Sequence, residues 1–296
     1  MRTPIFTGSG VAIVTPFRNE TVDLPALGHL IGLQLEAGTD AIIVCGTTGE
    51  ASTMTYRERM RTIEFCVEQV NGRVPVIAGS GSNATEVTVA LSRDAQHAGA
   101  DGLLMVTPYY NKASQTGLIR HYRVVADAVD RPVILYNVPS RTGVSIAPET
   151  YAKLAKHPNI VGVKEASGNL GNIQRTRTLC PEDFYIWSGN DDETVPICVL
   201  GGVGVISVVA NIAPALMHRL TQLCLTGDYR AAGALQVELK DLCDTMFCEV
   251  NPIPVKTAMG LMGLCEDTLR LPLCESSAAN RERIRSTLVR YGLIPA

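Results

Sequence analysis

The chain has 296 residues, of which 46% are hydrophobic and 19% are charged, and its formal net charge is −3. This composition is typical of a folded globular protein and excludes a disordered or fibrous one. The slightly acidic balance gives no electrostatic basis for nucleic-acid binding. Because the sequence opens without an apolar stretch of signal-peptide length, we expect a cytoplasmic protein.

Short β-branched runs alternate along the chain with segments of helical periodicity. This alternation is typical of repeated βα units around a parallel sheet. The eight runs are residues 11–14, 41–44, 74–78, 103–106, 133–136, 160–164, 184–187 and 203–207. Eight such units predict the α/β class and a (β/α)8 TIM barrel.

The end of the eighth unit is marked by Thr226, Gly227 and Asp228, which predict a helix end followed by the N-cap of a new helix. Everything beyond this point has helical periodicity. We therefore expect a barrel domain over residues 1–226, which carries the active site, and a C-terminal α-helical domain over residues 227–296. The uncharged stretch 195–217 contains prolines and glycines that favour a buried helix, a turn and a strand over a membrane span.

The nine cysteines include no Cys-x-x-Cys pair, and the five histidines include no His-x-x-x-His pair. This spacing argues against a disulfide framework and against a zinc site. The acidic segment 191–193 suggests a divalent-metal cluster, but three acids that open a helix are better explained by N-capping and the helix dipole. We expect reduced thiols and no metal.

Lys164 is the only charged residue in the apolar run 160–164. Burying an ammonium group is costly unless it is paired, so such a lysine tends to lose its proton and become a nucleophilic amine. Schiff-base catalysis needs such an amine. A structural lysine that pairs with a carboxylate or extends to solvent is the alternative.

Polar residues follow several of the other predicted strands, where the active site of a barrel lies. Strand two is followed by Thr47 and Thr48 between glycines, and these hydroxyls and backbone N–H groups suit a small carboxylate, although a plain loop is equally consistent. Tyr110 follows strand four and Tyr136 ends strand five. Phenols there suit acid–base chemistry, or else they pack in the core.

Six segments together resemble the family of pyruvate-dependent class I aldolases that includes N-acetylneuraminate lyase and dihydrodipicolinate synthase. The resemblance is closer to dihydrodipicolinate synthase, and it extends over nearly the whole chain. The segments are residues 46–50, 107–111, 136–143, 163–167, 188–191 and 251–256.

The resemblance implies that Lys164 forms an imine with the keto carbon of pyruvate, while Thr47 and Thr48 hold the pyruvate carboxylate. The imine is an electron sink, so the methyl carbon becomes an enamine that attacks L-aspartate 4-semialdehyde. The expected product is 4-hydroxy-tetrahydrodipicolinate, of lysine and diaminopimelate biosynthesis. Tyr136 is expected to transfer protons through the Thr48 hydroxyl to Tyr110, which enters from the neighbouring subunit of a tight dimer.

By the same resemblance, Arg141 is expected to bind the semialdehyde carboxylate as a bidentate pair, and the carbonyls of Gly189 and Ile206 are expected at the site. No metal or organic cofactor is required. The expected assembly is a homotetramer built as a dimer of dimers. A sister aldolase acting on N-acetylneuraminate or a 2-keto-3-deoxy sugar acid is an alternative, which Arg141 and Thr48 disfavour. A non-catalytic binding barrel is a third possibility, but such a protein is expected to have lost part of the catalytic set.

One departure from the family concerns feedback inhibition by lysine. In family members that lysine inhibits, the regulatory pocket at the dimer interface resembles a set built from a serine, two histidines, an asparagine and a glutamate. Of these five residues only the asparagine, Asn83, clearly remains in this chain. The other four positions hold Ala51, Tyr56, Arg59 and Val87. We therefore expect weak inhibition by lysine, or none.

Overall fold

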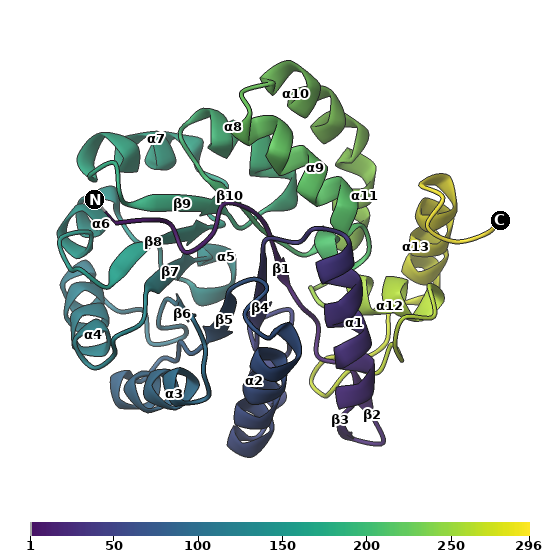
Figure 1. Cartoon of the computed structure of the whole chain (residues 1–296), viewed down its shortest axis with the longest axis horizontal. Helices are drawn as coiled ribbons and strands as arrows, with labels where there is room; N and C mark the ends of the chain where they lie inside the picture. Colours follow the sequence, from purple (N-terminus) through teal and green to yellow (C-terminus); the bar gives the residue numbers. More distant parts are fainter. Residues whose placement is uncertain (1) are drawn as a thin grey trace.

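The computed structural model describes residues 2–296, and its centre is a closed barrel of eight parallel strands (Figure 1). The barrel strands are β1 (Gly8–Ala12), β4 (Ala41–Val44), β5 (Val76–Gly79), β6 (Gly102–Val106), β7 (Val133–Asn137), β8 (Ile160–Glu165), β9 (Tyr185–Ser188) and β10 (Gly204–Ser207). β1 pairs with both β4 and β10, which closes the ring. The predicted (β/α)8 barrel is confirmed.

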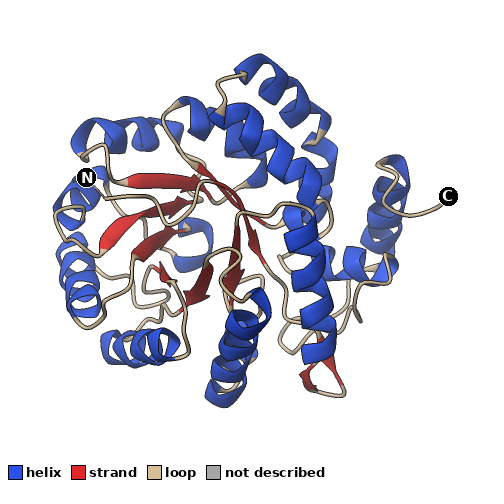
Figure 2. Ribbon diagram, in the orientation of Figure 1, coloured by secondary structure: helices blue, strands red, loops and turns tan. Residues whose placement is uncertain are grey.

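Helices surround the ring of strands (Figure 2). Those between the barrel strands are α1 (Leu24–Glu36), α2 (Tyr56–Val70), α3 (Thr85–His97), α4 (Gln115–Asp127), α5 (Pro139–Thr142), α6 (Pro148–Leu154), α7 (Leu170–Leu179) and α8 (Thr194–Val199), with the 3₁₀ turns η1 (Ala51–Thr53) and η2 (Asp191–Glu193). After β10 come η3 (Val209–Asn211), α9 (Pro214–Leu225), α10 (Tyr229–Glu238), α11 (Lys240–Met246), α12 (Ile253–Leu261) and α13 (Ala278–Arg290). Within residues 2–296, no helix combines the length and the apolarity that a membrane crossing needs.

The first strand begins at Gly8, before the predicted run at residues 11–14. Phe6 stacks on Trp187 inside the barrel, with ring centroids 5.3 Å apart. A Cβ atom at Gly10 would lie 2.9 Å from the Phe6 ring and 2.7 Å from Ile43, so only glycine fits beside these side chains. Because glycine is uncommon in strands, the β-branched pattern did not reveal this part of β1.

A small hairpin of β2 (Phe17–Arg18) and β3 (Thr21–Val22) follows β1 and was not predicted. Each strand has two residues, which is too short for an alternating pattern to be visible. The hairpin matters for the site because the fully buried ring of Phe17 packs against two cations from the C-terminal region, Lys256 and Arg270.

The C-terminal helical region begins where the sequence predicted. Thr226 ends α9, and the Asp228 side chain accepts a hydrogen bond of 3.0 Å from the Ala231 N–H at the start of α10. The buried residues of α10 to α13 belong to the same apolar cluster as the outer face of the barrel. The division into domains of residues 1–226 and 227–296 therefore stays a prediction.

Candidate active site

Lys164 and Tyr136 lie side by side at the C-terminal ends of β8 and β7. They are direct partners in the strand register, and the Lys164 Nζ lies 4.5 Å from the centroid of the Tyr136 ring. Lys164 is only 5% exposed. Burial lowers the pKa of its amine to about 8, the Asp191 charge opposes this shift, and the Arg141 charge adds to it. The local environment thus favours the neutral, nucleophilic amine.

Gly189 and Ile206 line the barrel around this pair. A Cβ atom at Gly189 would lie 3.1 Å from the Lys164 Cε and 2.7 Å from the Ala166 Cβ, so a side chain there would displace the lysine. Ile206 is fully buried in the same interior cluster as Tyr136. Both residues are therefore close to the lysine–tyrosine pair, and their roles toward a ligand stay predictions.

The hydroxyl beside Tyr136 is that of Thr47. Burial raises the pKa of the Tyr136 phenol, while the charge of Arg141 and a hydrogen bond from the Thr47 side chain oppose the rise. Such a bond links the phenol to a second group that can accept and pass on a proton.

The proton path expected through the Thr48 hydroxyl stays a prediction. The Thr48 Oγ1 accepts a hydrogen bond of 3.0 Å from the Asn251 Nδ2, and the residue is 2% exposed. The side chains of the two adjacent threonines thus have different partners, Tyr136 for Thr47 and Asn251 for Thr48. Two consecutive threonines in a sequence cannot show which of them faces the tyrosine.

A cavity of about 310 Å³ opens next to this group. Thr47, Tyr136 and Arg141 line it, and Lys164 lies beside it against the Tyr136 ring. Its remaining lining residues are Cys45, Gly46, Ala51, Ser52, Arg59, Gly79, Gly81, Leu104, Val106, Tyr109, Val138 and Thr142. Among residues 2–296, two arginines and no acidic residue line the cavity, so its charge suits an anionic ligand.

Arg141 is held at the edge of the cavity by the C-terminal region. It lies on the short helix α5, which directly follows β7, and its Nη2 donates a hydrogen bond of 3.1 Å to the backbone carbonyl of Asn251. The guanidinium has further N–H donors, so this bond leaves its fork available for a carboxylate.

Tyr110 is outside the set of residues that line the cavity of its own chain. It lies in the loop after β6, its backbone has a φ of +74°, and its side chain is 89% exposed. The preceding residue, Tyr109, lines the cavity instead. A large aromatic side chain with this exposure is available to a second copy of the chain.

The acidic residues 191–193 form the turn η2 just before α8, as the helix-dipole interpretation expects, but the Glu193 side chain forms no N-cap hydrogen bond with α8. Asp191 is fully buried, and its carboxylate accepts hydrogen bonds from the Ser207 hydroxyl and from the Val208 and Val209 N–H groups at the start of η3. It thereby joins β9 to β10 beside Lys164. Among residues 2–296, no group of three or more histidine, cysteine, aspartate or glutamate side chains is arranged to hold a metal ion.

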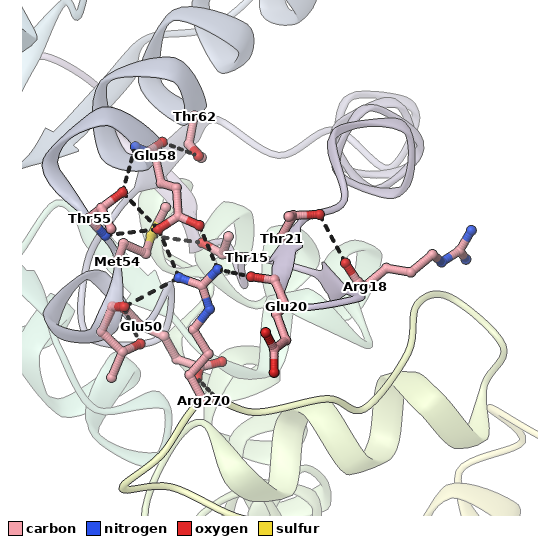
Figure 3. Close-up of polar contacts among 11 residues, drawn as sticks. Thr15, Arg18, Glu20, Thr21, Glu50, Met54, Thr55, Glu58, Thr62 and Arg270 are labelled. Carbon is pink, nitrogen blue, oxygen red and sulfur yellow. Dashed lines mark hydrogen bonds and ion pairs between the residues drawn. The ribbon is translucent and has the colours of Figure 1, made fainter.

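Glu50 anchors the threonine loop through a buried ion pair that the sequence did not reveal. Its Oε1 lies 2.5 Å from the Lys256 Nζ, and both side chains are almost fully buried. The Glu50 Oε2 accepts a hydrogen bond of 3.2 Å from the backbone N–H of Arg270. The Arg270 guanidinium in turn pairs with Glu58 at 2.5 and 2.9 Å (Figure 3). The loop that carries Thr47 and Thr48 is therefore tied to the C-terminal region.

The lowered pKa of Lys164 predicts how imine formation depends on pH. An amine with a pKa of about 8 is about one-tenth neutral at pH 7 and mostly neutral above pH 9, so the rate of imine formation should rise with a midpoint near 8. The measurement is the initial rate of borohydride trapping with saturating pyruvate, followed by intact mass. A midpoint near 10.5, the ordinary lysine value, would contradict the prediction.

The known proteins to which this chain is similar belong to one enzyme family. A model of the dihydrodipicolinate synthetase family matches residues 5–290. The 4-hydroxy-tetrahydrodipicolinate synthase of Thermoanaerobacter sp. (strain X514) is 55% identical over 292 residues, which cover 98% of each chain.

Solved structures give the same result. The dihydrodipicolinate synthase of Thermotoga maritima superposes with a TM-score of 0.97 at 44% identity, covering 98% of this chain and 100% of that one. The chloride-inhibited dihydrodipicolinate synthase of Acinetobacter baumannii, complexed with pyruvate, superposes with a TM-score of 0.95 at 42% identity, covering 97% of this chain and 99% of that one.

Proposed function

Because the chain belongs to the dihydrodipicolinate synthetase family, we propose that it condenses pyruvate with L-aspartate 4-semialdehyde to 4-hydroxy-tetrahydrodipicolinate, in lysine and diaminopimelate biosynthesis. The single observation that supports this most strongly is the buried, depressed-pKa Lys164 against Tyr136. The same two features suit a covalent mechanism without a metal or an organic cofactor. We propose a cytoplasmic location, which suits nine free cysteines.

The first half of the reaction forms the nucleophile. The Lys164 amine attacks the keto carbon of pyruvate, and loss of water leaves a protonated imine. Transfer of a methyl proton to a base then gives the enamine, with the iminium nitrogen taking up the electron pair. The Tyr136 ring lies 4.5 Å from the amine, and the Thr47 hydroxyl links this phenol to the cavity.

The second half joins the two substrates. The enamine carbon attacks the aldehyde carbon of the semialdehyde, and the aldehyde oxygen takes up a proton. The substrate amine then attacks the imine carbon, which closes the ring and returns the Lys164 amine. Arg141 is proposed to bind the semialdehyde carboxylate, because the part of its cavity formed by residues 2–296 is lined by two arginines and by no acidic residue.

The test is a coupled assay with purified protein, pyruvate, L-aspartate 4-semialdehyde and the next reductase, followed by NADPH oxidation. Turnover with the semialdehyde and none with N-acetylneuraminate or 2-keto-3-deoxy sugar acids would support the proposal. Turnover only with a sugar acid would identify the chain as a sister aldolase. Failure to form a borohydride-trapped adduct with pyruvate would reject the aldolase mechanism itself.

We further propose that Tyr110 completes the site of a partner subunit and that the assembly is a dimer of dimers, because Tyr110 is 89% exposed and is outside the set of residues that line its own cavity. Two inactive variants, Tyr110→Phe and Lys164→Ala, should complement each other when mixed and reassembled. About a quarter of wild-type activity should return, since half of random dimers are mixed and each has one intact site. Mixtures that stay inactive, although native mass spectrometry shows mixed dimers, would contradict the prediction.

Lysine should inhibit weakly, or not at all. Arg59 stands at one of the four positions that depart from the inhibited set, and its guanidinium would repel the ammonium groups of lysine. The Tyr56 hydroxyl is already engaged with Asp94 at 2.7 Å. Assays across lysine concentrations should show full activity at micromolar lysine, and half-inhibition in that range would contradict the prediction.

A further inference from the structure

We propose that Asn251 is a positioning residue that orients the Thr48 hydroxyl toward a bound carboxylate and fixes the distance between this hydroxyl and Arg141. The inference rests on the proposed function, in which Thr47 and Thr48 hold the pyruvate carboxylate and Arg141 holds that of the semialdehyde. Asn251 belongs to the connection between α11 and α12, so the C-terminal region would take part in substrate binding.

Asn251 contacts both carboxylate-binding elements at once. Its side-chain Nδ2 donates a hydrogen bond of 3.0 Å to the Thr48 Oγ1 in the loop after β4. Its backbone carbonyl accepts a hydrogen bond of 3.1 Å from the Arg141 Nη2 on α5. Asn251 is 6% exposed, so these bonds are largely shielded from water. A shift of this one residue would move Thr48 and Arg141 together.

The direction of the hydrogen bond determines what Thr48 can do. A hydroxyl has one proton to donate and two lone pairs to accept with. Because the Thr48 Oγ1 accepts from the Asn251 amide, its own proton remains available to a ligand oxygen. The Asn251 Oδ1 is buried and has no hydrogen-bond partner among residues 2–296. Leaving a buried amide oxygen without a hydrogen-bond partner costs free energy. Such unpaired oxygens are therefore uncommon in amides that have a purely structural role.

The C-terminal region holds Asn251 firmly in relation to the threonine loop. The Ile253 N–H donates to the Val250 carbonyl at 2.9 Å, which fixes the turn around Asn251. Lys256, from the same helix start, forms the buried ion pair with Glu50. The loop of residues 46–50 is therefore fixed at two points, Thr48 and Glu50, by one short segment of the C-terminal region. Rigid support of this kind is what precise substrate positioning requires.

The test uses Asn251→Asp in the full-length protein, because aspartate keeps the shape and reverses the hydrogen bond. The carboxylate would accept the Thr48 proton and repel a substrate carboxylate. We expect the half-saturating pyruvate concentration for borohydride trapping to rise at least about tenfold. The trapping yield at saturating pyruvate should stay near the wild-type value, because the loss is one of binding. The matched control is Asn172→Asp on the exposed face of α7, which should change neither quantity.

An unchanged pyruvate dependence in folded Asn251→Asp would overturn the proposal. So would a fall in trapping yield at an unchanged half-saturating concentration, which would indicate general disruption. If Asn251→Asp fails to fold, Asn251→Ala replaces it. Introduced into the wild type, Asn251→Ala should weaken pyruvate binding, but introduced into the Thr48→Val variant it should cause no further weakening. Additive losses of pyruvate binding in the double variant would overturn the proposal. Trapping needs only pyruvate, so a wild type that traps pyruvate but ignores the semialdehyde would reject the proposed function independently of this result.

Discussion

Replacing Lys164 with alanine is expected to abolish imine formation and to lower turnover at least ~10³-fold. The Lys164 amine is buried against Tyr136 and beside Gly189, and alanine at this position has no amine to form the imine. The measurements are the coupled assay and the intact mass after borohydride reduction with pyruvate. The variant should show no mass increase.

The matched control is Lys156→Ala, which removes an exposed lysine near the opposite end of β8. It should keep wild-type turnover and the full adduct. An adduct that persists in Lys164→Ala would place the nucleophile on another residue and contradict the assignment. Loss of the adduct together with loss of the folded circular dichroism spectrum would leave the chemistry undecided, so Lys164→Met, which preserves the apolar stem, is measured in parallel.

Most of the barrel could be predicted from the sequence because its strands are buried on both faces. A strand such as β4 then appears as a continuous β-branched run, and its predicted and observed limits agree. The sequence did not predict the start of β1, because this strand begins with Gly8, Ser9 and Gly10, and at Gly10 a Cβ atom would collide with Phe6 and Ile43.

The sequence predicted those parts of the site that are positioned by the ends of the barrel strands. Lys164 and Tyr136 are neighbours because β7 and β8 pair in register, which follows from the strand order of a barrel. The choice between Thr47 and Thr48 depends on loop geometry that periodicity does not encode. The contacts of Asn251 with Thr48 join residues about two hundred positions apart, and the segment 251–256 suggested family membership without suggesting a partner.

The ion pair between Lys256 and Glu50 should be the most costly single contact to break. Lys256→Met leaves the Glu50 carboxylate buried, with the Arg270 N–H as its remaining donor among residues 2–296. An uncompensated buried charge of this kind typically lowers the free energy of unfolding by about 3–5 kcal/mol. Equilibrium unfolding in urea, followed by circular dichroism, measures the change.

The double variant Lys256→Met/Glu50→Gln separates charge from packing. Glutamine removes the unpaired charge but keeps an oxygen for the Arg270 N–H, so most of the lost stability should return. If the double variant is as unstable as Lys256→Met, the loss comes instead from the contacts of Lys256 with the Phe17 ring and the Thr268 carbonyl. Lys240→Met, which breaks the exposed pair with Asp244, is the control and should cost less than about 1 kcal/mol. Because Glu50 follows Thr47 and Thr48 in one loop, the recovered stability should be accompanied by recovered pyruvate binding.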